Sequence, residues 1–445
     1  REAACRREVE LNRRLAPDVY LGVAEVRDPE GRPCDHLVVM RRMPVGRRLS
    51  ALVRADAGAA GVAEGVRQVA RQVAGFHERA ATSPEIAAAG SAASVARNWE
   101  DNFRQMAPFV GPVLDPALAS RAQWLARRYL AGRGPLLEHR AAAGMVRDGH
   151  GDLLADDIFL LDDGPRILDC IEFDDRLRHG DVLADVAFLA MDLERLGAPG
   201  LAARFLDWYR EFSGHPHPAT LAEHYVAYRA HVRAKVACLR HAQGDQDAAG
   251  EAAALLAQAV RHLERGRVRL ALVGGRPGTG KTTLAAALAD ATGWSLLRSD
   301  EVRRDLGRNT GPVAYRTGDY SDESVAVTYR EMLSRARTAL RLGEPVVLDA
   351  SWRHDVWRAL ARQVAAETAG DLVELRCEAP ADLAAARVAE RRAAGGDLSD
   401  ATAATAAAMA ADFDPWPGSV AVDTTRDLEE SLAAALDVAR TRPGE

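Results

Sequence analysis

One stretch of the sequence places glycines, a lysine and a threonine at a spacing suited to binding phosphate groups. Four residues separate Gly275 from Gly280, and Lys281 and Thr282 follow directly. Glycines let backbone N–H groups turn toward an anion, the lysine reaches the β- and γ-phosphates of a nucleotide, and the hydroxyl ligates magnesium. This is the P-loop pattern. We therefore predict that ATP and Mg²⁺ bind at Gly275, Arg276, Pro277, Gly278, Thr279, Gly280, Lys281, Thr282 and Thr283.

The flanking sequence supplies the two elements that must hold this loop. Residues 268–273 are an apolar run typical of a strand in a parallel sheet, and a helical pattern begins at Lys281. The positive end of that helix dipole would lie beneath the phosphates. Helical segments alternate with four further predicted strands, at residues 294–298, 345–348, 371–376 and 419–422. The fold class predicted for residues 267–445 is therefore α/β, a doubly wound parallel sheet with its site at the strand carboxyl ends.

Acidic residues follow two of the predicted strands, and arginines lie on a later predicted helix. With these residues, the segment 267–445 resembles the small P-loop kinases of the gluconate-kinase, polynucleotide-kinase and zeta-toxin type. The resemblance implies that Asp300 handles the acceptor hydroxyl and that Arg387 and Arg391 clamp phosphates ahead of a lid hinge at Gly395–Gly396. Asp349 ends an apolar strand, where an acid associated with magnesium would be useful. Strand-end acids also cap helices, and arginines also form solvated helix faces, so these simpler readings stay open.

A second set of acidic residues lies between two helical blocks, in the sequence VRDGHGDLLADDIFLLDDGPRILDCIEF. Asp152 follows His150 and Gly151, Asp157 comes five residues later, and Asp169 lies on the second of two predicted strands, at residues 158–161 and 166–171. Phosphoryl transfer needs one carboxylate that accepts the proton of the attacking hydroxyl and a second that holds magnesium. The alternative is that these acids are solvated loop residues.

This second set resembles the catalytic loop of the aminoglycoside phosphotransferase-like kinases, whose fold is that of protein kinases. The resemblance implies an α+β, mostly helical kinase-like domain over residues 1–266. It makes Asp152 the base and Asp169 a magnesium ligand. Asp157 stands where the family has Asn, and an Asp there can still ligate magnesium. Asp181 and Asp185 fit a helix that braces the loop, and we expect them to be structural.

The first domain also departs from that family. A kinase of this shape pairs a strand lysine with a helix glutamate, and Glu8 is a candidate for the glutamate. The only lysines in the chain are Lys235 and Lys281, and neither is suitably placed. The sequence starts without Met, inside an amphipathic helix pattern. We therefore expect a truncated chain with an incomplete N-terminal lobe, and weak nucleotide binding by the first domain.

Composition excludes several classes of function. The net charge of −6 gives no electrostatic basis for binding nucleic acid or an anionic membrane, and 5% aromatic residues support no base-stacking surface. No apolar run approaches the roughly 20 residues of a membrane span. Five scattered cysteines show neither a metal spacing nor a disulfide framework, which favours the reducing cytoplasm.

Two functions are compatible with these sequence features. The first is an ATP-dependent kinase that phosphorylates the hydroxyl group of a small molecule, with the C-terminal P-loop domain carrying the transfer. The second is a nucleotide-binding regulatory protein in which the first domain is an inactive binding module. An acceptor acid at Asp300 favours the enzyme, whereas Asp157 in place of Asn favours an inactive first domain. The identity of the acceptor and the oligomeric state are not specified by the sequence.

Overall fold

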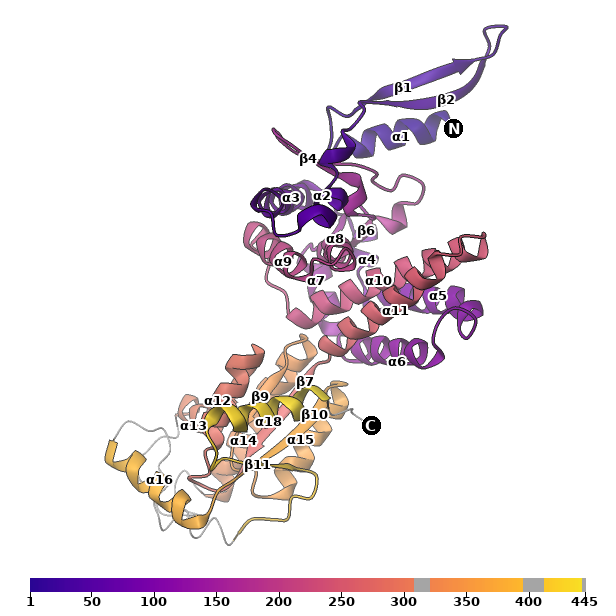
Figure 1. Cartoon of the computed structure of the whole chain (residues 1–445). Coiled ribbons are helices and arrows are strands. Elements are labelled where there is room, and N and C mark those ends of the chain that lie inside the picture. The colour runs from indigo at the N-terminus through magenta and orange to yellow at the C-terminus, as the bar shows by residue number, and fades with distance from the viewer. Residues whose placement is uncertain (308–320, 395–411, 442–445) are drawn as a thin grey trace. The chain divides into compact units, whose positions relative to one another are not determined.

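The computed structural model describes residues 1–307, 321–394 and 412–441, as backbone alone at 391–394, and divides the chain into two compact units (Figure 1). The first unit comprises Arg1–Leu130 and Gly134–Gly266. The second comprises Ala131–Arg133 and Arg267–Glu445. Within the described ranges, no helix combines the length and the hydropathy that a membrane crossing requires. All five cysteines are free thiols, and only Cys34 is exposed.

The second unit is built on a five-stranded sheet in which every neighbouring pair is parallel, which confirms the predicted parallel sheet. The spatial order is β11-β10-β7-β9-β8. The strands are β7 (Arg269–Gly274), β8 (Ser295–Arg298), β9 (Val346–Asp349), β10 (Asp371–Glu378) and β11 (Val420–Asp423). The helices are α12 (Lys281–Thr292), α13 (Ser299–Asp305), α14 (Asp322–Arg341), α15 (Asp355–Glu367), α16 (Ala381–Ala394) and α18 (Leu428–Thr441).

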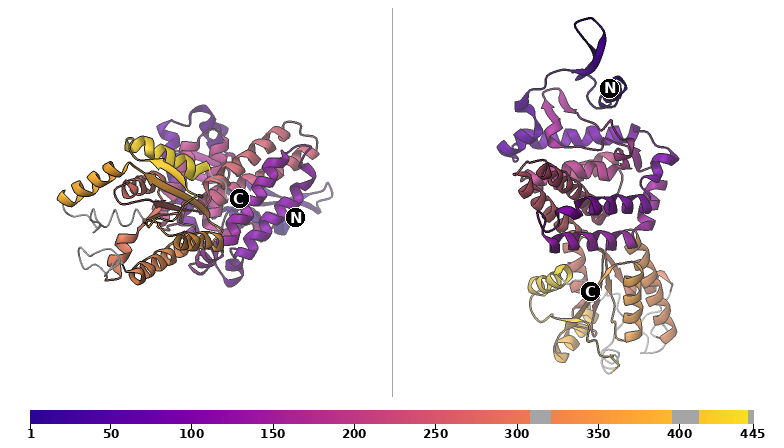
Figure 2. Two further views of the ribbon diagram at one scale, coloured as in Figure 1. Left: turned by 90° about the horizontal axis from the view of Figure 1, so that it is seen from below. Right: turned by 90° about the vertical axis from the view of Figure 1, so that its right-hand side faces the viewer.

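The central strand β7 is buried along its whole length, which explains its nearly continuous apolar sequence. Ala271 and Val273 pack with Leu284 and Leu288 of α12 and with Ala435 of α18 on one face of the sheet. The helices α14 and α15 lie on the opposite face (Figure 2). Covering both faces holds the sheet rigid and leaves the carboxyl ends of its strands available for a site.

The first unit is mostly helical, with three short antiparallel strand pairs. The pairs are β1 (Tyr20–Arg27) with β2 (Pro33–Met40), β3 (Val146–Asp148) with β6 (His179–Asp181), and β4 (Ile158–Leu161) with β5 (Gly164–Ile167). The helices are α1 (Glu2–Asn12), α2 (Leu49–Asp56), α3 (Ala60–Arg79), α4 (Pro84–Ala88), α5 (Ala92–Met106), α6 (Pro116–Gly132), α7 (Gly134–Ala142), α8 (Val182–Arg195), α9 (Pro199–Ser213), α10 (Ala219–Ala242) and α11 (Ala248–Arg265). Residues 182–193 of α8 are all buried, so α8 is the central helix of this unit.

The strand predicted over residues 166–171 is wrong in its second half. β5 ends at Ile167, and Asp169 adopts a left-handed backbone conformation with φ +66°. The Leu168 N–H donates to the Asp157 carbonyl at 2.9 Å, outside the β4–β5 ladder. Asp169 is therefore a loop residue after the strand pair. The strands β3 and β6 were not predicted, because strands of three residues carry no recognisable alternation in the sequence.

Candidate functional site

The glycine loop between β7 and α12 has the backbone conformation that its sequence predicts. Gly278 and Gly280 have φ +81° and +78°, in the region that only glycine adopts without strain. A Cβ atom on Gly278 would overlap the backbone carbonyl of Ala384 on α16, so no other residue fits this turn. Helix α12 begins at Lys281, directly after the turn. The N-terminal N–H groups of α12 therefore face the position where phosphates would bind.

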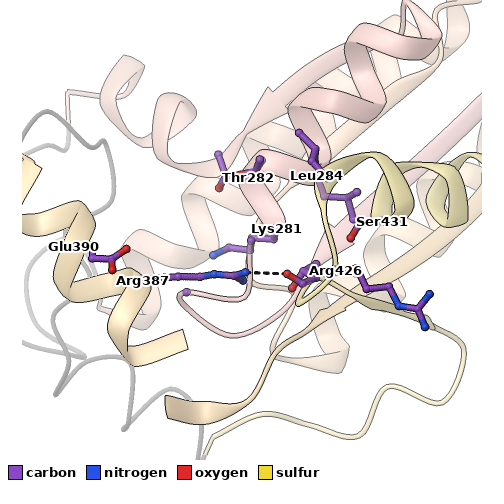
Figure 3. Close-up of a pocket in the computed structure, with 12 residues that line it drawn as sticks. Lys281, Thr282, Leu284, Arg387, Glu390, Arg426 and Ser431 are labelled. Atoms are coloured by element: carbon purple, nitrogen blue, oxygen red, sulfur yellow. Dashed lines mark hydrogen bonds between the residues drawn. The ribbon is translucent and has the colours of Figure 1, made fainter. Parts of the chain in front are cut away.

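A cavity of about 430 Å³ opens beside this loop (Figure 3). Besides Lys281, Thr282 and Thr283, it is lined by Arg387 of α16 and by the segment that follows β11. Arg387 donates to the carbonyl of Thr424 at 2.9 Å, and the Thr424 hydroxyl donates to the Thr279 carbonyl at 2.8 Å. These two hydrogen bonds connect α16, the loop after β11 and the P-loop around one cavity.

The P-loop residues divide between two cavities. Thr282 and Thr283 line the first together with Lys281, whereas Gly275, Arg276 and Thr279 line a second cavity of about 750 Å³. Trp416 also lines the second cavity, and its indole is buried.

Asp349 ends β9 directly beside the P-loop strand, because Val273 of β7 is its register partner. Its side chain is buried, and within the described residues its Oδ1 atom accepts no hydrogen bond. Burial raises the pKa of this carboxyl, while Lys281 and the Thr282 hydroxyl act in the opposite direction. A buried carboxylate oxygen without a donor, beside a threonine hydroxyl, fits the hard oxygen ligands that Mg²⁺ prefers.

Asp300 lies one strand further along the same edge of the sheet. It belongs to α13, which begins directly after β8, and it pairs with Arg303 at 2.7 Å. Its negative charge contributes to the raised pKa of Asp349, so the two carboxylates act on one another electrostatically. Arg298, at the end of β8, places its Nε 3.5 Å from the Asp349 carboxylate. The structure thus gathers the two predicted acids and Lys281 at the carboxyl edge of the sheet.

The predicted phosphate-clamping arginines are only partly described. Arg387 lines the cavity, and its contact with phosphate stays a prediction. The side chain of Arg391 and the hinge at Gly395–Gly396 lie outside the described residues. The sequence reading assigned no role to Thr424 or Arg426, which line the same cavity. The polar residues 423–425, directly after the strand predicted at residues 419–422, could have indicated this site, because α/β sheets bind ligands at the carboxyl ends of their strands.

The catalytic-loop candidate of the first unit is held by a buried aspartate, as expected from its sequence. Asp185 accepts the N–H groups of His150 at 2.7 Å and of Gly151 at 2.8 Å. It also contacts Nε2 of His77 at 3.0 Å. Burial by itself raises the pKa of the Asp185 carboxyl, but these hydrogen bonds and the neighbouring histidines hold it below its ordinary value. Asp181 pairs with both Nε and Nη2 of Arg140 and caps α8, so it too is structural.

The three acids predicted for this loop lie close enough to interact electrostatically. Burial raises the pKa of Asp157 to about 7, and the charges of Asp169 and Asp152 add to the shift. Burial likewise raises the pKa of Asp152, against the effect of Arg233 and Arg229. In the part of the chain that the structure describes, no three His, Cys, Asp or Glu side chains are arranged to hold a metal ion. Two protein ligands together with phosphate oxygens would still suffice for magnesium.

Glu8 of α1 faces the same acidic loop. Its pKa is raised by burial and by the charges of Glu172 and Asp169. The Asp169 N–H donates to the Tyr20 hydroxyl at 3.2 Å, which ties the loop to β1. The charges that act on the Glu8 carboxyl are therefore those of two other acids, and no ion pair is recorded for Glu8 among the described residues.

A protein-family model matches one segment of the chain, and two mycobacterial proteins are similar to nearly all of it. A protein-family model described as an AAA domain (AAA_33) matches residues 270–416. "Uncharacterized protein Mb2027c" of Mycobacterium bovis and "Uncharacterized protein Rv2004c" of Mycobacterium tuberculosis are each 43% identical to the chain over 445 residues. The alignments cover 99% of this chain and 88% of each relative.

Solved kinases also resemble part of the chain. An unliganded sugar kinase from Janibacter sp. HTCC2649 is 22% identical, covers 39% of this chain and 96% of its own, and has a TM-score of 0.32. The Mycobacterium tuberculosis APS kinase CysC, solved with AMPPNP and APS, is 22% identical, covers 39% of this chain and 97% of its own, and has a TM-score of 0.31.

Proposed function

The chain belongs to the same family as the mycobacterial proteins Mb2027c and Rv2004c, and on that premise we propose that its second unit is an ATP-dependent small-molecule kinase. One observation carries the proposal. Lys281 and Thr282 of the P-loop lie beside the buried carboxylate of Asp349, whose Oδ1 accepts no hydrogen bond from the described residues, and Asp300 follows the neighbouring strand β8 at the same edge of the sheet. A nucleotide-binding loop alone does not require the second acid, whereas a hydroxyl acceptor does.

The proposed roles follow from position and charge. Lys281 and the N–H groups of the glycine loop bind the β- and γ-phosphates, and Arg387 contributes a further positive charge across the cavity. Asp300 orients the acceptor hydroxyl and takes its proton as the oxygen bonds to the γ-phosphorus and the bond to the β-phosphate oxygen breaks. ADP leaves with the electron pair of that bond.

Thr282 and Asp349 are the residues that would hold magnesium in this site. When bound with the nucleotide, the ion neutralises negative charge on the phosphates. The buried position of Asp349 keeps its carboxylate beside the P-loop without competing water.

For the first unit, we propose a kinase-like fold of the aminoglycoside phosphotransferase type, with Asp152 at the position of the base and Asp157 and Asp169 at those of the metal ligands. A regulatory alternative, in which this unit only binds a ligand, has one specific observation in its favour. The carboxyls of Asp157, whose pKa is about 7, and of Glu8, whose pKa is also raised, stand where a nucleotide kinase needs cations.

The test is phosphorylation of a metabolite panel by the full chain with labelled ATP, followed by kinetics on the best acceptor. Asp300→Asn should lower turnover by about 10²–10⁴-fold, the usual contribution of a general base, and leave ATP affinity unchanged. Asp305→Asn is the matched control, because Asp305 ends the same helix and also pairs with an arginine, Arg335, at 2.6 Å. If Asp300→Asn and Asp305→Asn turn over the acceptor equally fast, Asp300 is not the base.

A further inference from the structure

Helix α10 carries two arginines one helical turn apart that both act on Asp152 of the first unit. Nη1 of Arg233 lies 4.0 Å from Oδ2 of Asp152, and the charge of Arg229 also acts on that carboxylate. A spacing of four residues places both guanidinium groups on the same face of the helix. The predicted base of this unit therefore lies against two positive charges.

The two arginines are held differently. Arg229 donates from Nε to the Ala184 carbonyl at 2.8 Å, and its guanidinium lies over the Phe188 ring at 4.4 Å. These contacts fix its position and leave its terminal nitrogens without a hydrogen bond in the described structure. Arg233 forms no hydrogen bond with the described residues, since 4.0 Å exceeds hydrogen-bond distance. Several guanidinium donors are therefore available beside one carboxylate.

Arg233 and Asp152 are also partly exposed to solvent. Their side chains are 26% and 27% exposed, so both are in contact with solvent. Asp192 of α8 also acts electrostatically on Asp152. Its carboxylate is already paired with Arg195 at 2.7 Å and accepts the Ala155 N–H at 2.9 Å. Asp192 therefore does not satisfy the donors of Arg233 or Arg229.

We propose that Arg233 and Arg229 form an anion-binding site that places the hydroxyl of a small hydroxylated carboxylate or phosphate ester next to Asp152. Guanidinium groups bind both oxyanion types through charge-assisted hydrogen bonds, and their planar donor sets suit either one. A polycationic acceptor such as an aminoglycoside would instead meet two like charges at the predicted base. Only the role of Asp152 as a base rests on the proposed kinase-like assignment; the anion site stands on the arginines.

Direct binding to the full chain, without nucleotide, tests the site. The probes are D-glycerate, glycerol 3-phosphate, neutral glycerol and the aminoglycoside kanamycin, measured by calorimetry and ligand-observed NMR at low ionic strength. We expect the two anions to bind and glycerol and kanamycin not to bind. Comparing the two anions distinguishes a carboxylate from a phosphate as the preferred group.

Variants separate this site from the P-loop, which also attracts phosphate. Arg233→Gln should weaken anion binding by about 10–100-fold, as expected for lost charge-assisted hydrogen bonds, and Arg233→Lys should weaken it less. Asp152→Asn should strengthen it, because the competing carboxylate charge is removed. The control is Arg240→Gln, on the same helix, where Arg240 pairs with Asp245 and Glu251.

Three outcomes would overturn the proposal: no anion binding by the wild-type chain, equal binding by Arg233→Gln, or preferential binding of kanamycin. Because none of these measurements uses ATP, they stay informative if the chain phosphorylates nothing. Absence of phosphorylation combined with anion binding that depends on Arg233 would refute the kinase proposal for this unit and leave the anion site standing.

Discussion

Replacing Asp157 with asparagine should stabilise the protein above neutral pH. The pKa of this carboxyl is about 7 in the folded chain, compared with an ordinary value of 3.8, chiefly because of burial. The folded state therefore binds the proton more tightly than the unfolded state does. Stability falls as the pH rises from the ordinary pKa to the folded pKa, and the full penalty is present above about pH 7.

The magnitude follows from the size of this shift. A difference of about 3 pKa units corresponds to roughly 4 kcal/mol, which is an upper limit because the Asp157 side chain retains some exposure to solvent. Asparagine removes the charge and keeps the shape of the side chain. The increase in the free energy of unfolding should therefore approach this limit near pH 8 and be about 2 kcal/mol smaller near pH 5.5, where the penalty is only partly developed.

The assay is urea unfolding of wild type and Asp157→Asn at both pH values, following the transition of the first unit. The matched control is Asp162→Asn, because Asp162 is an exposed turn residue whose ion pair with Arg47 is expected to contribute little. A stabilisation by Asp157→Asn that is the same at both pH values would refute the electrostatic argument. A destabilisation near pH 8 would show that the Asp157 carboxylate has a favourable partner in solution.

Three further predictions concern single residues. Lys281→Ala should reduce ATP affinity at least about tenfold in calorimetry, whereas Lys235→Ala, at the only other lysine, should not; equal affinities would exclude the predicted phosphate contact. Asp349→Asn should weaken ATP binding in the presence of Mg²⁺ and leave magnesium-free binding unchanged, and a loss in both titrations would argue against a metal role. His262, between Glu194 at 2.6 Å and Glu223 at 2.5 Å, has a pKa raised by these carboxylates despite its burial. His262→Gln should cost on the order of 3 kcal/mol below about pH 6.5, and less as the pH rises through the folded pKa; thermal unfolding that shows a pH-independent cost would contradict this.

Local sequence patterns were enough to predict the features that depend on neighbouring residues. The glycine spacing and the apolar run before it specify a strand, a turn and a helix, because each is a local conformational preference. The same holds for the predicted strand that Asp349 terminates in the structure. Where the local signal was weak, the prediction was wrong: Asp169 lies in a left-handed loop and not on a strand.

The contacts between distant residues could not be predicted in this way and follow from the packing of the folded chain. The strand order places β9 next to β7 and β8 beyond it, so Asp349 adjoins the P-loop and Asp300 lies one strand further away. Arg387 and Thr424 close the cavity from segments far along the chain, and Arg233 reaches Asp152 across 81 positions of sequence (233 − 152). These contacts depend on how helices and strands pack against one another. Packing between segments remote in the sequence leaves no periodic pattern that could be recognised beforehand.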